Sequence, residues 1–107
     1  FENFIVMEAL KDRLNRGESP EMYFYRDSAG NEVDLLLPFE GGLHAIEMKA
    51  GATVNDDYFK GLKTFAVHYP QTVRGGSVIF GGEQGQQRSN WPVHSWRALG
   101  NSPVGVR

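Results

Sequence analysis

The sequence contains no cysteine, which excludes disulfide bonds and thiolate metal sites. No apolar run approaches the roughly 20 residues that a membrane-spanning helix needs, and no signal-peptide pattern opens the chain. A phosphate-binding loop of the form G-x-x-x-x-G-K is missing as well. These absences predict a cytoplasmic protein with no membrane segment and no ATP site within this stretch.

The charges that are present nearly cancel, and a formal net charge of −2 gives no global argument for nucleic-acid binding. Their distribution is uneven, since residues 1–53 hold ten acids against five bases and residues 54–107 hold six bases against three acids. This asymmetry suits a metal site beside a phosphate-contacting surface, and equally an ordinary domain whose two halves attract each other.

The 107 residues, 40% of them hydrophobic, predict one compact domain over 1–107. Because a helical pattern starts at Phe1, we expect the chain to be a piece of a longer protein. Periodicity and turn signals predict an α/β fold with the order α-β-β-β-α-β-β. The expected helices cover 1–15 and 56–69, and the expected strands 22–26, 32–37, 43–49, 76–82 and 93–99. Residues 82–90 are expected to form a flexible loop.

The first helix has apolar residues on more than one side. Val6, Leu10 and Leu14 recur every four residues, a spacing that predicts a helix with one apolar face. Glu8 falls on another side, in a patch with Phe1 and other large apolar groups, which is an unusual environment for a carboxylate.

The stretch Glu32–Gly51 carries charged residues within two strand-like runs. Because side chains alternate along a strand, Asp34 shares a face with Glu32 and Leu36, opposite Val33, and Glu47 shares a face with Lys49. A four-residue loop over Phe39–Gly42 would place Asp34 across from Glu47, whereas a two-residue Gly41–Gly42 turn would place it across from Lys49. Both registers gather Asp34, Glu47 and Lys49 on one face.

Two carboxylates on directly opposed strand positions lie about 4.5–5.5 Å apart at their Cβ atoms, close enough to converge on one Mg²⁺. Without a cation, such charges repel by about 3 kcal/mol at an effective dielectric of 20. If the first helix lays Glu8 over the same face, a third negative charge joins them. These residues therefore predict either a metal site or the ordinary wet face of an antiparallel hairpin.

A resemblance adds to this reading. Glu8 on the first helix, "EVD" with Asp34 and "IEMK" with Glu47 and Lys49 resemble the PD-(D/E)XK nuclease superfamily. More closely, "FENFIVMEALK", "YFYRDSAGNEVDLLL", "LHAIEMKAG" and "VHSWRAL" are similar to the uncharacterised C-terminal domain of prokaryotic AAA-type ATPases. The resemblance implies a restriction-endonuclease-like α-β-β-β-α-β core, in which helices flank a mixed sheet with a central antiparallel hairpin. It also implies an ATPase domain, with its ATP, N-terminal to this chain.

The same resemblance implies roles for individual residues. Asp34, Glu47 and Glu8 would bind Mg²⁺ or Mn²⁺, with the backbone carbonyl of Met48 as a further ligand. Lys49 would orient or help deprotonate the attacking water, so that Lys49, Glu47, Asp34 and Glu8 form the catalytic set. The expected activity is metal-dependent hydrolysis of DNA phosphodiesters. The alternative is a catalytically silent nuclease-like domain that binds nucleic acid or a protein for the ATPase. Val33 replaces the proline of the superfamily's name.

Other charged residues have two interpretations. Arg26 contacts a phosphate or, more simply, pairs with Asp27 or Glu32. Lys60 and Lys63 form a DNA-facing edge or a solvated helix face. His44, on the strand face opposite Glu47, is expected to be a core histidine.

Overall fold

The structure, a computed structural model, describes residues 2–17, 21–53, 56–83, 85–88 and 91–97. Its elements follow the chain as α1 (Glu2–Asn15), β1 (Tyr23–Arg26), β2 (Glu32–Phe39), β3 (Gly42–Lys49), the 3₁₀ helix η1 (Asp56–Phe59), α2 (Lys60–His68), β4 (Val73–Phe80), β5 (Gln86–Arg88) and β6 (Trp91–Ser95). The strands form one sheet in the order β1-β2-β3-β4-β6-β5. The pairs β3–β4 and β4–β6 are parallel and the other pairs antiparallel.

The predicted α/β class is confirmed, as is a mixed sheet with an antiparallel hairpin between two helices. Two details differ. The segment expected to be a loop contains β5, because Gln86–Arg88 pairs with β6 and forms the last strand of the sheet. The second helix is split, since its first turn tightens into a 3₁₀ helix, a common way for helices to begin.

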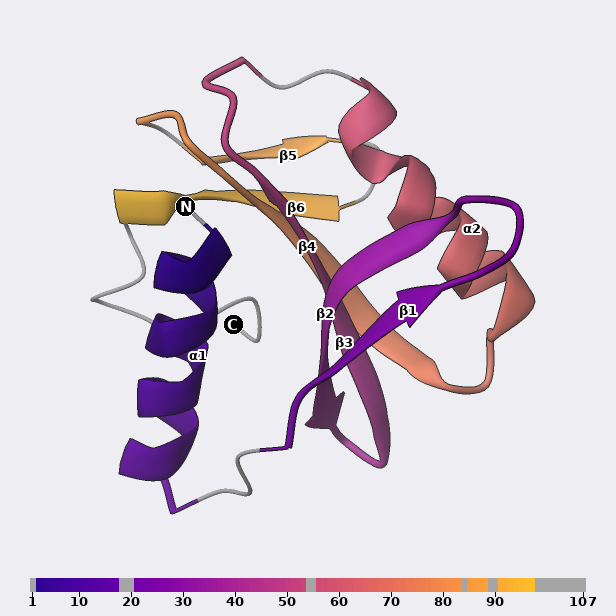
Figure 1. The fold of residues 1–107 in the computed structure, drawn as a ribbon, viewed down its shortest axis with the longest axis horizontal. Helices are drawn as coiled ribbons and strands as arrows, with labels where there is room; N and C mark the ends of the chain where they lie inside the picture. The colour runs from indigo at the N-terminus through magenta and orange to yellow at the C-terminus, as the bar shows by residue number, and fades with distance from the viewer. Residues whose placement is uncertain (1, 18–20, 54–55, 84, 89–90, 98–107) are drawn as a thin grey trace.

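The two helices cover opposite faces of the sheet (Figure 1). On one face, η1 and α2 bury Phe59, Leu62 and Phe65 against a cluster that includes Leu36, Ala45, Val78 and Phe80. On the other face, α1 buries Ile5 and Ala9 against Leu35, Leu37, Ile46, Met48 and Ile79. The sheet therefore separates two hydrophobic clusters, one on each of its faces.

The face of α1 that packs on the sheet is centred on Ile5 and Ala9. Ile5, Ala9 and Arg13 are buried, whereas Met7 and Leu14 are 52% and 56% exposed. Apolar side chains project from most sides of this helix, so their spacing alone does not determine which side packs on the sheet. The small Ala9 side chain lies at the contact, and Arg13 Nη2 donates a 2.7 Å hydrogen bond to the carbonyl of Pro38. Phe1, expected beside Glu8, lies outside the described residues.

The β2–β3 hairpin adopts the first of the two predicted registers, because Pro38 pairs with Leu43. The connection is shorter than a four-residue loop, since Phe39 and Gly42 also pair and leave only Glu40 and Gly41 in the turn. Both turn residues have positive φ, 49° and 78°, as type I′ hairpin turns require.

Candidate metal and phosphate pocket

A bulge in β2 shapes the site. Tyr23 pairs with Leu36 but Tyr25 pairs with Val33, so three steps along β2 match two along β1. Val33 consequently joins Leu36 in the α2-side cluster, and the prediction that they face opposite sides is wrong. The reason is the extra residue, which interrupts the alternation and re-aims the side chains beside it. Asp34 lies at this interruption.

Carboxylates replace the backbone ladder beyond the bulge. The paired positions of β2 and β3 end at Leu35 and Ile46. Past that point, the Met48 amide donates to Asp34 Oδ2 at 2.8 Å, and the Asp34 amide donates to Glu47 Oε1 at 3.1 Å. The two acidic side chains therefore stand in the fork where the strands separate, each bonded to the backbone of the other strand.

Glu47 is buried, with a side chain only 6% exposed. Burial is the main cause that raises its pKa to about 7, and the nearby Asp34 carboxylate adds to the rise, while Lys49 opposes it. Gly61 of α2 explains how the helix comes so close. A Cβ at Gly61 would collide with the backbone carbonyl of Glu32 and lie 3.6 Å from the Glu47 carboxyl carbon. Glycine thus lets α2 cover this carboxylate.

Lys49 lies between an acid and a ring. Its Nζ is 3.5 Å from Glu47 Oε2 and 5.9 Å from the centre of the Tyr58 ring, within the range of a weak cation–π contact. The side chain keeps 36% exposure, so its ammonium group is both held and reachable from solvent.

These groups open into a pocket of about 210 Å³ between the fork and the start of α2. Its charged lining consists of four carboxylates, from Glu32, Asp34, Glu47 and Asp57, and two ammonium groups, from Lys49 and Lys60. The excess of acid over base makes the pocket a favourable place for a cation. The turn residues Gly30 and Asn31 complete one wall.

Glu8 does not line this pocket, and the expectation that it completes the acidic cluster is wrong. It belongs to α1, which packs on the opposite sheet face through Ile5 and Ala9, and it forms an ion pair with Lys11 at 3.4 Å. Within the described ranges, no three acidic or histidine side chains gather closely enough to hold a metal ion. A metal at the fork would therefore have two carboxylate ligands, Asp34 and Glu47.

Two carboxylates fit Mg²⁺, which usually takes one or two together with waters and substrate oxygens. The Met48 carbonyl has a suitable direction. Along a strand, successive carbonyls point to opposite sides, and the Lys49 carbonyl accepts from Gly81 on the β4 side. The Met48 carbonyl therefore faces β2, on the side where its own amide meets Asp34.

The other charged residues considered in the sequence analysis differ in their partners and in whether they line this pocket. Arg26 Nε pairs with Glu32 at 2.9 Å, while Asp27 Oδ1 accepts from the backbone of Ala29 and Asn31 and shapes the turn. Lys60 lines the pocket, whereas Lys63 is not part of its lining.

His44 lies buried on the α1 side, as expected, with Nε2 3.3 Å from Ser77 Oγ. Its pKa is lowered to about 4, chiefly by burial and then by the charge of His94.

The sequence reasoning missed Asp57, Tyr58 and Gly61 as site residues. For Gly61 a signal exists, because a glycine inside a helix is about 1 kcal/mol less favourable than alanine and often marks a close approach. For Asp57 and Tyr58, the sequence offers no such signal, since either is ordinary at the start of a helix.

Fold and pocket together define a mixed α/β domain with an acidic, lysine-bearing pocket at a strand fork. The chain belongs to the DUF4143 family, a domain of unknown function whose match covers residues 1–99. No curated protein and no solved structure matches the chain. Among the described residues, no helix is both long and apolar enough to cross a membrane.

Proposed function

We propose that this domain is a nuclease-like, Mg²⁺- or Mn²⁺-dependent phosphodiesterase of the PD-(D/E)XK kind that acts on DNA. The observation that carries the proposal is the convergence of Asp34, Glu47 and Lys49 in one open pocket. An acid pair and a lysine in this arrangement provide metal ligands and a positive charge at the same point. An ATPase domain N-terminal to the chain is part of the proposal and rests on the sequence resemblance alone.

Each group has a distinct task. Asp34, Glu47 and the Met48 carbonyl would hold the ion, which when bound would acidify water and neutralise charge on the phosphodiester. Lys49 orients the attacking water and places its ammonium group beside the phosphate oxygens. Lys60, across the same pocket, contacts a neighbouring phosphate.

A second candidate is a catalytically silent domain that binds nucleic acid or a protein. A specific observation favours it: Asp34 and Glu47 already accept backbone amides of the neighbouring strands. They therefore have a structural task in the sheet that needs no metal.

Metal binding is tested by thermal unfolding with EDTA, Mg²⁺ or Mn²⁺. At a metal concentration about a hundredfold above Kd, we expect a stabilisation of about 2.7 kcal/mol, or roughly 10 °C in Tm. Asp34→Asn and Glu47→Gln should remove this shift, because each deletes a charged ligand. Glu8→Gln is the matched control and should retain it. Superimposable curves with and without metal would contradict the proposal.

Cleavage is tested with supercoiled, branched and single-stranded DNA in Mn²⁺, using the full-length protein with and without ATP. Lys49→Ala should lower the rate by at least about a hundredfold, as expected for loss of a group that positions or deprotonates the nucleophile. Metal binding without any cleavage would favour the silent domain. Cleavage that survives in Lys49→Ala would come from another enzyme.

A further inference from the structure

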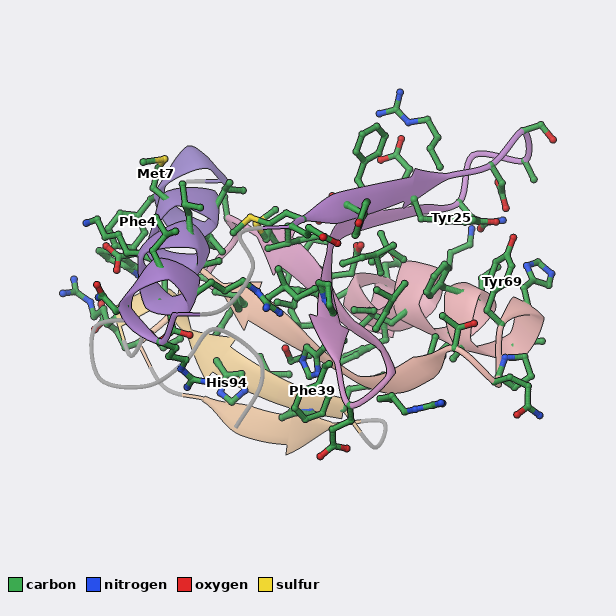
Figure 2. The ribbon with its side chains drawn as sticks, turned by 90° about the horizontal axis from the view of Figure 1, so that it is seen from below. Phe4, Met7, Tyr25, Phe39, Tyr69 and His94 are labelled. Carbon is green, nitrogen blue, oxygen red and sulfur yellow. The ribbon has the colours of Figure 1, made fainter. Side chains whose placement is uncertain are left out.

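The edge strand β1 presents an aromatic side chain to solvent. Tyr25 turns toward α2, where its ring centre lies 4.8 Å from that of Phe65 and 5.8 Å from that of Tyr69 (Figure 2). Its neighbour Phe24 is 73% exposed. β1 is the first strand in the sheet order, and among the described residues no further strand pairs with its outer edge. Phe24 thus offers a flat apolar surface at the sheet edge.

Phe24 lines a second pocket, of about 150 Å³, that shares two lining residues with the first. The residues that line this smaller pocket belong to β1 and β2, and they also include Arg26, Glu32 and Asp34. Glu32 and Asp34 line both pockets. A ligand held at Asp34 can therefore extend along the strand edge to Phe24.

The chemistry of this edge suits a nucleotide. A ring offers a stacking surface to any base, and an adjacent guanidinium offers several N–H donors to a phosphate. Arg26 lines the same pocket as Phe24, is 68% exposed, and has its Nε 2.9 Å from Glu32 Oε1. In a duplex the faces of the bases are covered by their stacked neighbours, so only an unpaired base can lie on Phe24.

We infer that Phe24 and Arg26 form a subsite for an unpaired nucleobase and its phosphate, next to the phosphodiester held at Asp34. The substrate class is single-stranded or locally unpaired nucleic acid. This inference rests on the proposed function, which supplies the phosphodiester site at the shared wall of the two pockets.

The test measures binding of a fluorescent oligothymidylate, and of a duplex of equal length, by anisotropy in Ca²⁺. Phe24→Ala should weaken single-strand binding by about five- to 150-fold, the usual effect of losing one stacked base. Phe24→Trp should retain binding, because it keeps a stacking surface. Tyr23→Ala is the matched control, since this neighbour on β1 is 49% exposed but does not line the pocket. Duplex binding should change little in any variant.

The outcomes separate the two proposals. Phe24-dependent single-strand binding without Mn²⁺-dependent cleavage would support the subsite and contradict the nuclease. Cleavage with single-strand binding that Phe24→Ala leaves unchanged would retain the nuclease and overturn the subsite. Failure of the wild type to bind the oligothymidylate, or equal dependence of duplex binding on Phe24, would also overturn it. The subsite would also be overturned if the oligothymidylate bound through Phe24 were displaced only by an extended peptide that pairs with β1.

Discussion

The two faces of the sheet bury ionisable groups only three residues apart on β3, with different consequences. On the α2 face, Glu47 is 5% exposed and opens into a pocket beside Asp34 and Lys49. On the α1 face, His44 is 6% exposed and meets Ser77 and the ring of Phe39. Burial alone therefore does not mark a functional site. The difference lies in whether other charged groups and an opening accompany the buried residue.

Burial also acts on the two groups with opposite signs. It raises the pKa of Glu47 to about 7, above its ordinary value of 4.5, and lowers that of His44 to about 4, below 6.5. The stability linked to Glu47 is present below pH 4.5 and is lost as the pH rises through 7. The stability linked to His44 is present above pH 6.5 and is lost as the pH falls through 4.

The largest expected effect follows from the opposite pKa shifts of Glu47 and His44. In EDTA, Glu47→Gln should gain stability over the wild type by up to about 3 kcal/mol as the pH rises from 4 to 8. His44→Gln should lose a similar amount relative to the wild type over the same range, because it removes the opposite proton linkage. Urea unfolding at several pH values measures both differences. If the stability differences of both variants from the wild type changed in the same direction with pH, burial would not shift the pKa values of Glu47 and His44 in opposite directions.

A smaller effect is expected at the contact that closes the α2 face. Gly61→Ala should destabilise the domain by about 1–3 kcal/mol despite the better helix propensity of alanine, because the new methyl group meets the Glu32 carbonyl. The urea midpoint measures this loss. Lys63→Ala, two residues along the same helix and exposed, is the control and should stay near the wild type. A Gly61→Ala protein of unchanged stability would mean that α2 does not press on β2.

The smallest effect concerns the two lysines of α2. Under the proposed function, Lys60→Ala should weaken DNA binding and reduce the slope of log K against log salt by about one, because it would remove one proposed phosphate contact. Lys63→Ala should leave the slope unchanged, since Lys63 does not line the pocket. Binding titrations at several salt concentrations compare them. Equal changes in both variants would point to a diffuse basic helix rather than a pocket contact.

Some of the site could be predicted because its causes are local. The period of two along β2 and β3 brought Asp34, Glu47 and Lys49 to one pocket, and the hairpin connection is short enough to restrict the register. The placement of Glu8 failed for a different reason. A helix with apolar residues on most sides fits a sheet in several rotations, and here the rotation buries Ile5 and Ala9. The bulge at Asp34 arises from pairing with β1, which lies eight to eleven residues earlier in the chain.

By itself, the sequence determined the order of the helices and strands apart from β5, and the acid–lysine pattern of the hairpin, because periodicity and turn chemistry act between residues close along the chain. Only the tertiary structure decided that α2 covers Glu47, that Glu8 lies on the far side of the sheet, and that Phe24 and Arg26 adjoin Asp34. These outcomes depend on contacts between segments distant in sequence, where side-chain volume and close approach of backbones select one packing among several.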